Sequence, residues 1–130
     1  ASPAARAKGI TLAVEFIDSP SVNADSDRIF RVLSNLLGNA VKFTPDRGTI
    51  TIRAAQRSDD FSITVADTGP GIAADHLPHV FERYWKGATA SGSGLGLYIA
   101  KGIVEAHGGK IWAEPSTAGA RFTFTLPLSR

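Results

Sequence analysis

The chain has 130 residues, of which 43% are hydrophobic and 20% are charged, a composition typical of one folded globular domain. Its 14 Lys and Arg against 12 Asp and Glu give a net charge of +2, which is too small and too dispersed for a nucleic-acid-binding surface. The absence of Cys excludes disulfides, Cys-ligated zinc and a thiol nucleophile, and no apolar run approaches the roughly 18–20 residues of a membrane span. We therefore expect a cytoplasmic domain without direct membrane contact.

The first third of the chain predicts an extension, a strand and a long helix. Residues 1–9 are small and polar without an apolar period, so we expect an N-terminal extension to a domain over residues 10–130. From Ile10 an alternating, β-branched pattern predicts a strand that an Asp-Ser-Pro turn ends. Residues 25–27 (Asp-Ser-Asp) offer N-caps for a helix that runs to about Phe43, before a Thr-Pro pair.

Alternation continues in the middle of the chain, where residues 49–56 and 60–67 predict two strands of a hairpin. A turn cluster and a segment of ambiguous structure follow, and residues 87–94 are small and flexible in composition. Residues 95–107 are apolar over most of a helical circumference, which predicts a mostly buried helix.

Two more alternating segments, residues 109–114 and 120–128, complete a set of about five strands and two to three helices. Strands in runs of two with intervening helices favour an α+β fold, with one mixed sheet and helices packed on one face.

The first helix carries polar residues opposite its apolar positions. At 100° per residue, Asn35, Asn39 and Lys42 share one side. Such a stripe is either solvated surface or part of a binding site. Asn is a poor helix former, which favours the second interpretation: its amide oxygen is a hard ligand suited to Mg²⁺, and its nitrogen and a Lys ammonium donate to phosphates.

Asp67 ends a predicted strand and precedes a turn that contains Gly69 and Gly71. One interpretation is a loop in which Asp caps a turn and the glycines adopt positive φ. The other is a pocket in which glycines let a flat ligand approach the backbone while the carboxylate accepts a hydrogen bond from an amine such as that of adenine. The residues alone leave both open.

Glycines at positions 92, 94 and 96 open the second long helix in a GxGxG pattern. A glycine-rich turn into a helix N-terminus presents free N–H groups to an anion. The spacing is neither the dinucleotide GxGxxG nor a P-loop, so we expect neither of those folds. The aromatic and basic residues just before it, from Phe81 to Lys86, form either a small apolar cluster or an anchored lid.

The order of these segments is more specific than any one of them. Residues 35–45, 67–71, 81–84 and 92–97 resemble, in that order, the N, G1, F and G2 boxes of the catalytic domain of sensor histidine kinases. The resemblance covers nearly the whole chain and implies the Bergerat ATP-binding fold. That fold is a two-layer α/β sandwich, in which about three helices cover one face of a mixed sheet, with an ATP lid.

The resemblance implies a site for Mg·ATP. Asn39 would ligate Mg²⁺, and Phe43 would lie against the adenine. Asp67 would accept a hydrogen bond from the adenine amine. The other positions carried over would contact the phosphates, shape the pocket or support the base: Asn35, Lys42, Gly69, Gly71, Lys86, Gly92, Gly94, Leu95, Gly96 and Thr123.

The resemblance also implies a protein-histidine kinase without an acid, base or nucleophile of its own. Related gyrase-type ATPases typically have Glu at the position of Asn35, and an amide cannot act as a general base. No histidine of the chain has the His-Glu or His-Asp context of the family's acceptor helix. The accepting histidine would therefore lie on a separate dimerisation domain, and a response regulator would receive the phosphate from that histidine. The chain would be a monomer that binds ATP without autophosphorylation.

Two alternatives stay open. One is a gyrase-type ATPase of the same superfamily, and the other is a degenerate nucleotide-binding module.

Overall fold

The computed structural model describes residues 6–16, 26–56, 59–85, 95–114 and 119–127. Five strands of this part form one sheet: β1 (Thr11–Phe16), β2 (Thr49–Gln56), β3 (Asp60–Asp67), β4 (Ile111–Glu114) and β5 (Arg121–Pro127). Its helices are α2 (Ser26–Phe43), the 3-10 helix η1 (Leu77–His79) and α3 (Gly96–Ala106). Within this part, none of the helices has both the length and the apolar character that crossing a membrane requires.

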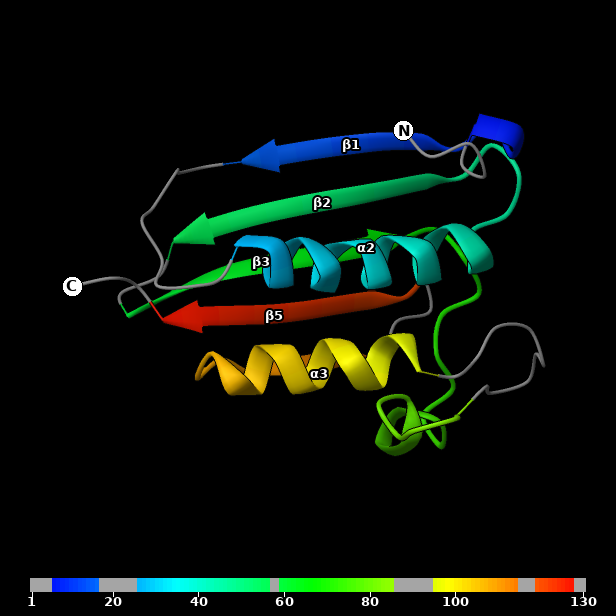
Figure 1. The fold of residues 1–130 in the computed structure, drawn as a ribbon. Helices are drawn as coiled ribbons and strands as arrows, with labels where there is room; N and C mark the ends of the chain where they lie inside the picture. Colours follow the sequence, from blue (N-terminus) through cyan, green and yellow to red (C-terminus); the bar gives the residue numbers. More distant parts are fainter. Residues whose placement is uncertain (1–5, 17–25, 57–58, 86–94, 115–118, 128–130) are drawn as a thin grey trace.

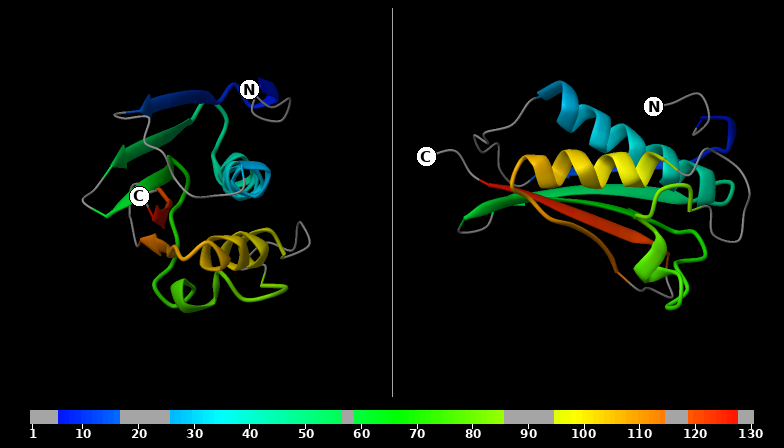
Figure 2. Two further views of the ribbon diagram at one scale, coloured as in Figure 1. Left: turned by 60° about the vertical axis from the view of Figure 1, so that its left-hand side comes forward. Right: turned by 60° about the horizontal axis from the view of Figure 1, so that its bottom comes forward.

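The strands lie in the order β1-β2-β3-β5-β4. β1 pairs with β2 in parallel, and the other three pairings are antiparallel, so the sheet is mixed. The connection from β1 to the parallel β2 runs through α2, as a parallel pair requires. Both α2 and α3 lie on one face of the sheet (Figure 2). The predicted α+β sandwich is confirmed, with α2 and α3 forming the helical layer on one face of the sheet.

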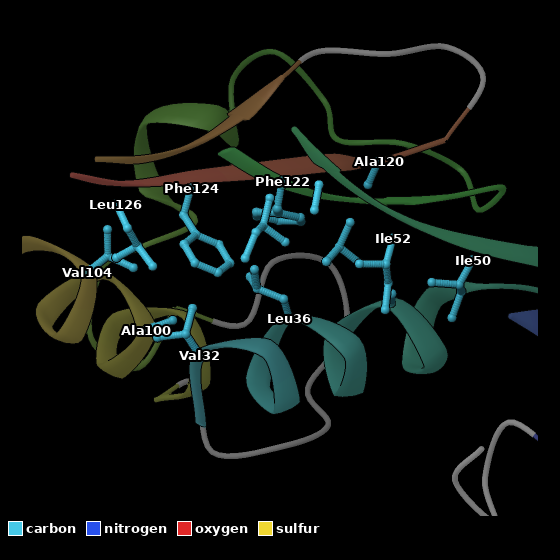
Figure 3. Close-up of a cluster of buried hydrophobic side chains, with 14 of the residues drawn as sticks. Val32, Leu36, Ile50, Ile52, Ala100, Val104, Ala120, Phe122, Phe124 and Leu126 are labelled. Atoms are coloured by element: carbon cyan, nitrogen blue, oxygen red, sulfur yellow. The ribbon is translucent and has the colours of Figure 1, made fainter. Parts of the chain in front are cut away.

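The core lies between this face and the two helices (Figure 3). Alternate residues of β2 and β5 point toward the helices, because successive side chains of a strand alternate between faces. Phe124, at the centre of β5, is fully buried. Its neighbours in the core come from both layers: Val32, Leu36 and Ala40 of α2, Ala100 and Val104 of α3, Ile50 and Ile52 of β2, and Phe122 and Leu126 of β5.

The direction of each element brings chemically distinct groups to one end of the sandwich. α2 ends, α3 begins, β3 ends and β5 begins at the right-hand end of the view in Figure 1. The polar residues of α2, the carboxylate that ends β3 and the N-terminus of α3 are therefore neighbours in space although they lie far apart in the sequence.

Candidate functional site

Asp67 is a buried carboxylate at this end of the sheet, and backbone hydrogen bonds hold it in place. It is the last residue of β3, and it is only 7% exposed. Its Oδ1 accepts two backbone hydrogen bonds, from the N–H of Gly69 at 2.8 Å and from the N–H of Ala120 at 3.1 Å. Among the described residues, Oδ2 accepts no hydrogen bond. One oxygen thus orients the carboxylate, and the other is available to a donor on a ligand.

Two glycines allow the backbone to approach Asp67 closely. A Cβ added to Gly69 would lie 2.7 Å from the carbonyl oxygen of Phe43 and 3.0 Å from Oδ1 of Asp67. A Cβ added to Gly119 would lie 1.8 Å from the carbonyl oxygen of Asp67, and Gly119 has a φ of +127°. Gly71, in the same loop as Gly69, has a φ of +83°. Glycine is therefore required at positions 69 and 119 because a Cβ would not fit, and at positions 71 and 119 because φ is positive.

Asn35 joins α2 to the start of α3. Its Nδ2 donates to the carbonyl oxygen of Gly96 at 3.1 Å, and a Cβ on Gly96 would lie 4.0 Å from the Asn35 side chain. Asn35 is half-buried, so at this position the polar side of α2 is not fully solvated. Leu95, the N-cap of α3, provides no side-chain cap, which leaves the first-turn N–H groups without that partner.

Asn39 lies one turn after Asn35 and is also half-buried. Its amide makes no hydrogen bond within the described part of the chain. Lys42 is exposed, with its ammonium 5.3 Å from the centroid of the Phe43 ring. The carbonyl of Phe43 faces Gly69, so this last turn of α2 borders the loop that follows Asp67.

The structure does not bring Thr123 to this group. Its Oγ1 lies 3.1 Å from Oγ1 of Thr64, with which it is paired in register. Thr64 and Asp67 are three positions apart on β3, so their side chains point to opposite faces of the sheet. Ala120, the residue just before β5, does reach Asp67, because its backbone N–H donates to that carboxylate. Lys86, Gly92 and Gly94 lie outside the described residues.

The aromatic segment before the second helix packs on the core. The ring of Phe81 meets that of Phe122 edge-to-face at 6.0 Å between centroids. The Trp85 ring meets that of His76 edge-to-face and that of His79 at a tilt, each at 5.2 Å between centroids. This segment is therefore anchored, as both interpretations of the sequence expect, and two of the three histidines have ring partners.

Residues 24–130 match the family described as "Histidine kinase-, DNA gyrase B-, and HSP90-like ATPase". The chain belongs to this family. Its curated relatives include the adaptive-response sensory kinase SasA of Synechococcus elongatus, 44% identical over 118 residues, which cover 87% of this chain and 30% of SasA. The signal transduction histidine-protein kinase BaeS of Escherichia coli is 39% identical over 129 residues, covering 95% of this chain and 28% of BaeS. The chain thus spans about a third or less of the length of these relatives.

Solved structures of this ATPase family have the same fold. Full-length ShkA in complex with AMPPNP aligns with a TM-score of 0.87 at 36% identity, over 98% of this chain and 27% of that one. The histidine kinase ThkA in complex with the response regulator protein TrrA aligns with a TM-score of 0.82 at 31% identity, over 96% of this chain and 36% of that one. These likenesses favour the histidine kinase branch of the family over the gyrase branch.

Proposed function

We propose that this domain binds Mg·ATP and holds the γ-phosphate for transfer to a histidine on a separate dimerisation and phosphoacceptor domain. The observation that carries the proposal is the Asp67 carboxylate, which two backbone N–H groups fix through Oδ1 while Oδ2 is left for a ligand. An adenine amine is a donor that fits this oxygen. The complex of the similar ShkA with AMPPNP, an adenine nucleotide, supports this choice of ligand.

The adenine would lie between β3 and the last turn of α2. Gly69 and Gly71 shape the loop beside Asp67 and keep side chains out of it. Phe43 adjoins the same loop and offers a ring to the face of the base. The base would therefore be recognised by one carboxylate oxygen and by close backbone packing.

The phosphates would lie between Asn39 and the start of α3. The start of α3 at Gly96, where the N-cap residue gives no side-chain cap, presents the positive end of the helix dipole to an anion, and Gly92, Gly94 and Lys86 are proposed to complete this cradle. Asn35 and Lys42 flank it on α2, with Lys42 adding positive charge. We propose no role for Thr123, since its hydroxyl contacts Thr64 on the other face.

The residues present fit a magnesium ion that is carried by the nucleotide. Within the described residues no three His, Cys, Asp or Glu side chains come together as metal ligands. Mg²⁺ is usually held by few protein ligands and by substrate phosphates, and the Asn39 amide oxygen is a hard ligand of the right kind. The ion would neutralise charge on the phosphates, while Asn39 holds them in place.

The geometry favours transfer over hydrolysis. Asn35 uses its Nδ2 to bond the Gly96 carbonyl, which an ionised Glu at this position would be unable to do, and an amide cannot deprotonate water. The remaining contribution of the site is positioning and charge neutralisation. In the transfer, the bond between the γ-phosphorus and the β,γ-bridging oxygen breaks as a bond from the histidine nitrogen to phosphorus forms, leaving ADP and phosphohistidine.

Mixing this chain, Mg·ATP and a separate phosphoacceptor domain tests the proposal. We expect acid-labile phosphate on histidine of the acceptor and no label on the chain alone. Label on Ser or Thr would contradict a histidine kinase. Steady phosphate release by the chain alone would favour the ATPase alternative, and absence of nucleotide binding would favour the degenerate module. A cytoplasmic response regulator would then take the phosphate, as the complex of ThkA with TrrA suggests.

Asn39→Ala should abolish most of the magnesium dependence of nucleotide binding. We expect affinity for Mg·AMPPNP to fall about tenfold or more, because a hard ligand to the metal is lost, while metal-free affinity stays closer to that of the wild type. Titration calorimetry with and without Mg²⁺ measures both values. Equal losses in the two conditions would show that Asn39 does not ligate the ion.

A further inference from the structure

The Lys8 side chain closes the end of α2. Its Nζ donates to the carbonyl oxygens of Val41 at 2.9 Å, Lys42 at 3.3 Å and Thr44 at 2.9 Å. We call this arrangement the Lys8 clasp. A helix leaves its last four carbonyls without intrahelical partners and carries a partial negative charge at this end. One ammonium therefore satisfies several of these groups and complements the charge.

The backbone around Lys8 fixes the clasp in place. The carbonyl of Lys8 accepts a hydrogen bond from the Arg47 N–H at 2.7 Å. Gly9 turns the chain with a φ of +66°, and Thr11 donates to the Gly48 carbonyl at 3.0 Å. The residues before β1 are thus bonded to the loop that follows α2. Lys8 acts as part of the domain, although the sequence places it in an N-terminal extension.

The Lys8 clasp and the core contact the same turn, residues 41–44 at the end of α2, from opposite sides. Ala40 is the last core residue of α2, and beyond it Thr44 is fully buried, with its Oγ1 and N–H both bonded to the Ala40 carbonyl at 2.6 and 2.9 Å. Lys8 binds the same turn from outside. Without Lys8, residues 41–44 would keep the Thr44 hydrogen bonds, their place in the helix and the partial packing of Val41 on the core, but their carbonyls would lose the ammonium that binds them.

This turn borders the proposed nucleotide site. It contains Phe43, whose carbonyl oxygen would be 2.7 Å from a Cβ at Gly69, and it begins two residues after Asn39. Gly69 in turn donates to Asp67 at 2.8 Å. A continuous set of contacts therefore leads from Lys8 through the end of α2 to the loop beside the carboxylate.

We propose that Lys8 is a positioning residue for the nucleotide site, which acts through the last turn of α2 and does not touch the nucleotide. The inference rests on the proposed function, since it makes Lys8 a support of the proposed ATP site. It implies that a displacement of the chain before β1 changes nucleotide affinity, because such a displacement moves Lys8 and disturbs its hydrogen bonds to the end of α2.

Lys8→Met tests the proposal, since Met keeps the length of the side chain and removes its charge and donors. We expect Mg·AMPPNP to bind about 3- to 10-fold more weakly, and the Lys8→Arg variant to restore binding to within about twofold of the wild type. Lys110→Met is the matched control, because Lys110 is exposed and its side chain makes no hydrogen bond among the described residues. Calorimetry is done well below the melting temperature of every variant.

A second measurement separates positioning from general stability. Amide hydrogen exchange should become faster at residues 42–44 in Lys8→Met and stay unchanged at Leu36, in the body of α2. A lowered melting temperature with unchanged affinity in the folded protein would overturn the proposal. If Lys8→Met does not fold, Lys8→Gln replaces it in the same comparison, and a failure of both to fold would also overturn the proposal. If the wild type binds no nucleotide, the proposed function itself is wrong, which is a different outcome.

Discussion

Asp67→Asn should weaken binding of Mg·AMPPNP by about 10- to 100-fold while the domain stays folded. Asn can place its amide oxygen where Oδ1 accepts hydrogen bonds from Gly69 and Ala120, so the local backbone keeps its partners. The amide nitrogen then replaces Oδ2 and faces the adenine amine as a second donor. Titration calorimetry gives the affinity, and a thermal melt of the same sample shows that the fold is retained.

Asp60→Asn is the matched control for this change. Asp60 begins the strand that Asp67 ends, so the same substitution is made at the far end of β3. Its Oδ1 is buried without a hydrogen-bond partner in the described structure, and removal of its charge breaks no hydrogen bond of that atom. We expect affinity within about twofold of the wild type. Equal weakening by both substitutions would refute the role given to Asp67.

Gly119→Ala should destabilise the domain by about 3 kcal/mol or more. The φ of +127° is strained for an L-residue, and the new Cβ would lie 1.8 Å from the Asp67 carbonyl oxygen, a contact that requires the backbone to move. For a domain of this size, that loss corresponds to a fall of roughly 10 °C or more in the melting temperature. Nucleotide binding should also weaken, because the movement pulls the Ala120 N–H away from Asp67.

Gly102→Ala controls for the added methyl group. Gly102 lies exposed within α3, and a Cβ there would meet nothing within 4 Å. Ala is the better helix former, so we expect unchanged stability or a gain of up to about 1 kcal/mol. Thermal melts and urea titrations compare the two variants. A Gly119→Ala protein as stable as Gly102→Ala would show that the contact with Asp67 relaxes at little cost.

Local patterns were sufficient to predict most of the secondary structure. The two strands over residues 49–56 and 60–67 have the predicted bounds, and burial alternates along β2 and along β3 from Ile63 onward, as the alternating sequence predicts. The long helices begin and end within one residue of the predicted positions, since N-cap residues, a Thr-Pro pair and a Gly-Gly pair mark their ends. The mixed sheet and its helical layer followed from the order of these elements.

Contacts between segments that lie far apart in the sequence could not be predicted from local patterns. Periodicity placed Asn35 on a polar side of α2, but only the packing of α3 shows that this side faces another helix. Lys8 has no neighbouring signal, because its partners are backbone carbonyls more than 30 residues away. The Ala120 N–H was missed for the same reason, although the Gly119 before it was a detectable sign of close backbone approach.

Thr123 is a position where the resemblance and the strand alternation point to different faces of the sheet. Its position rested on a resemblance, whereas the alternation of Phe122 and Phe124 with it along β5 already indicates the face opposite the core. The hydrogen bond to Thr64 agrees with that alternation. Strand periodicity thus predicts the face of the sheet that this side chain occupies.

The position of β5 makes nucleotide recognition conditional on a completed sheet. β5 is the last of the described strands in chain order, yet it lies between β3 and β4, and the N–H that orients Asp67 precedes it directly. Pairings between segments so far apart form late, because a long loop must close first. A chain in which β5 has not joined the sheet lacks this donor, so the ligand would select fully folded molecules and raise their melting temperature as its concentration rises.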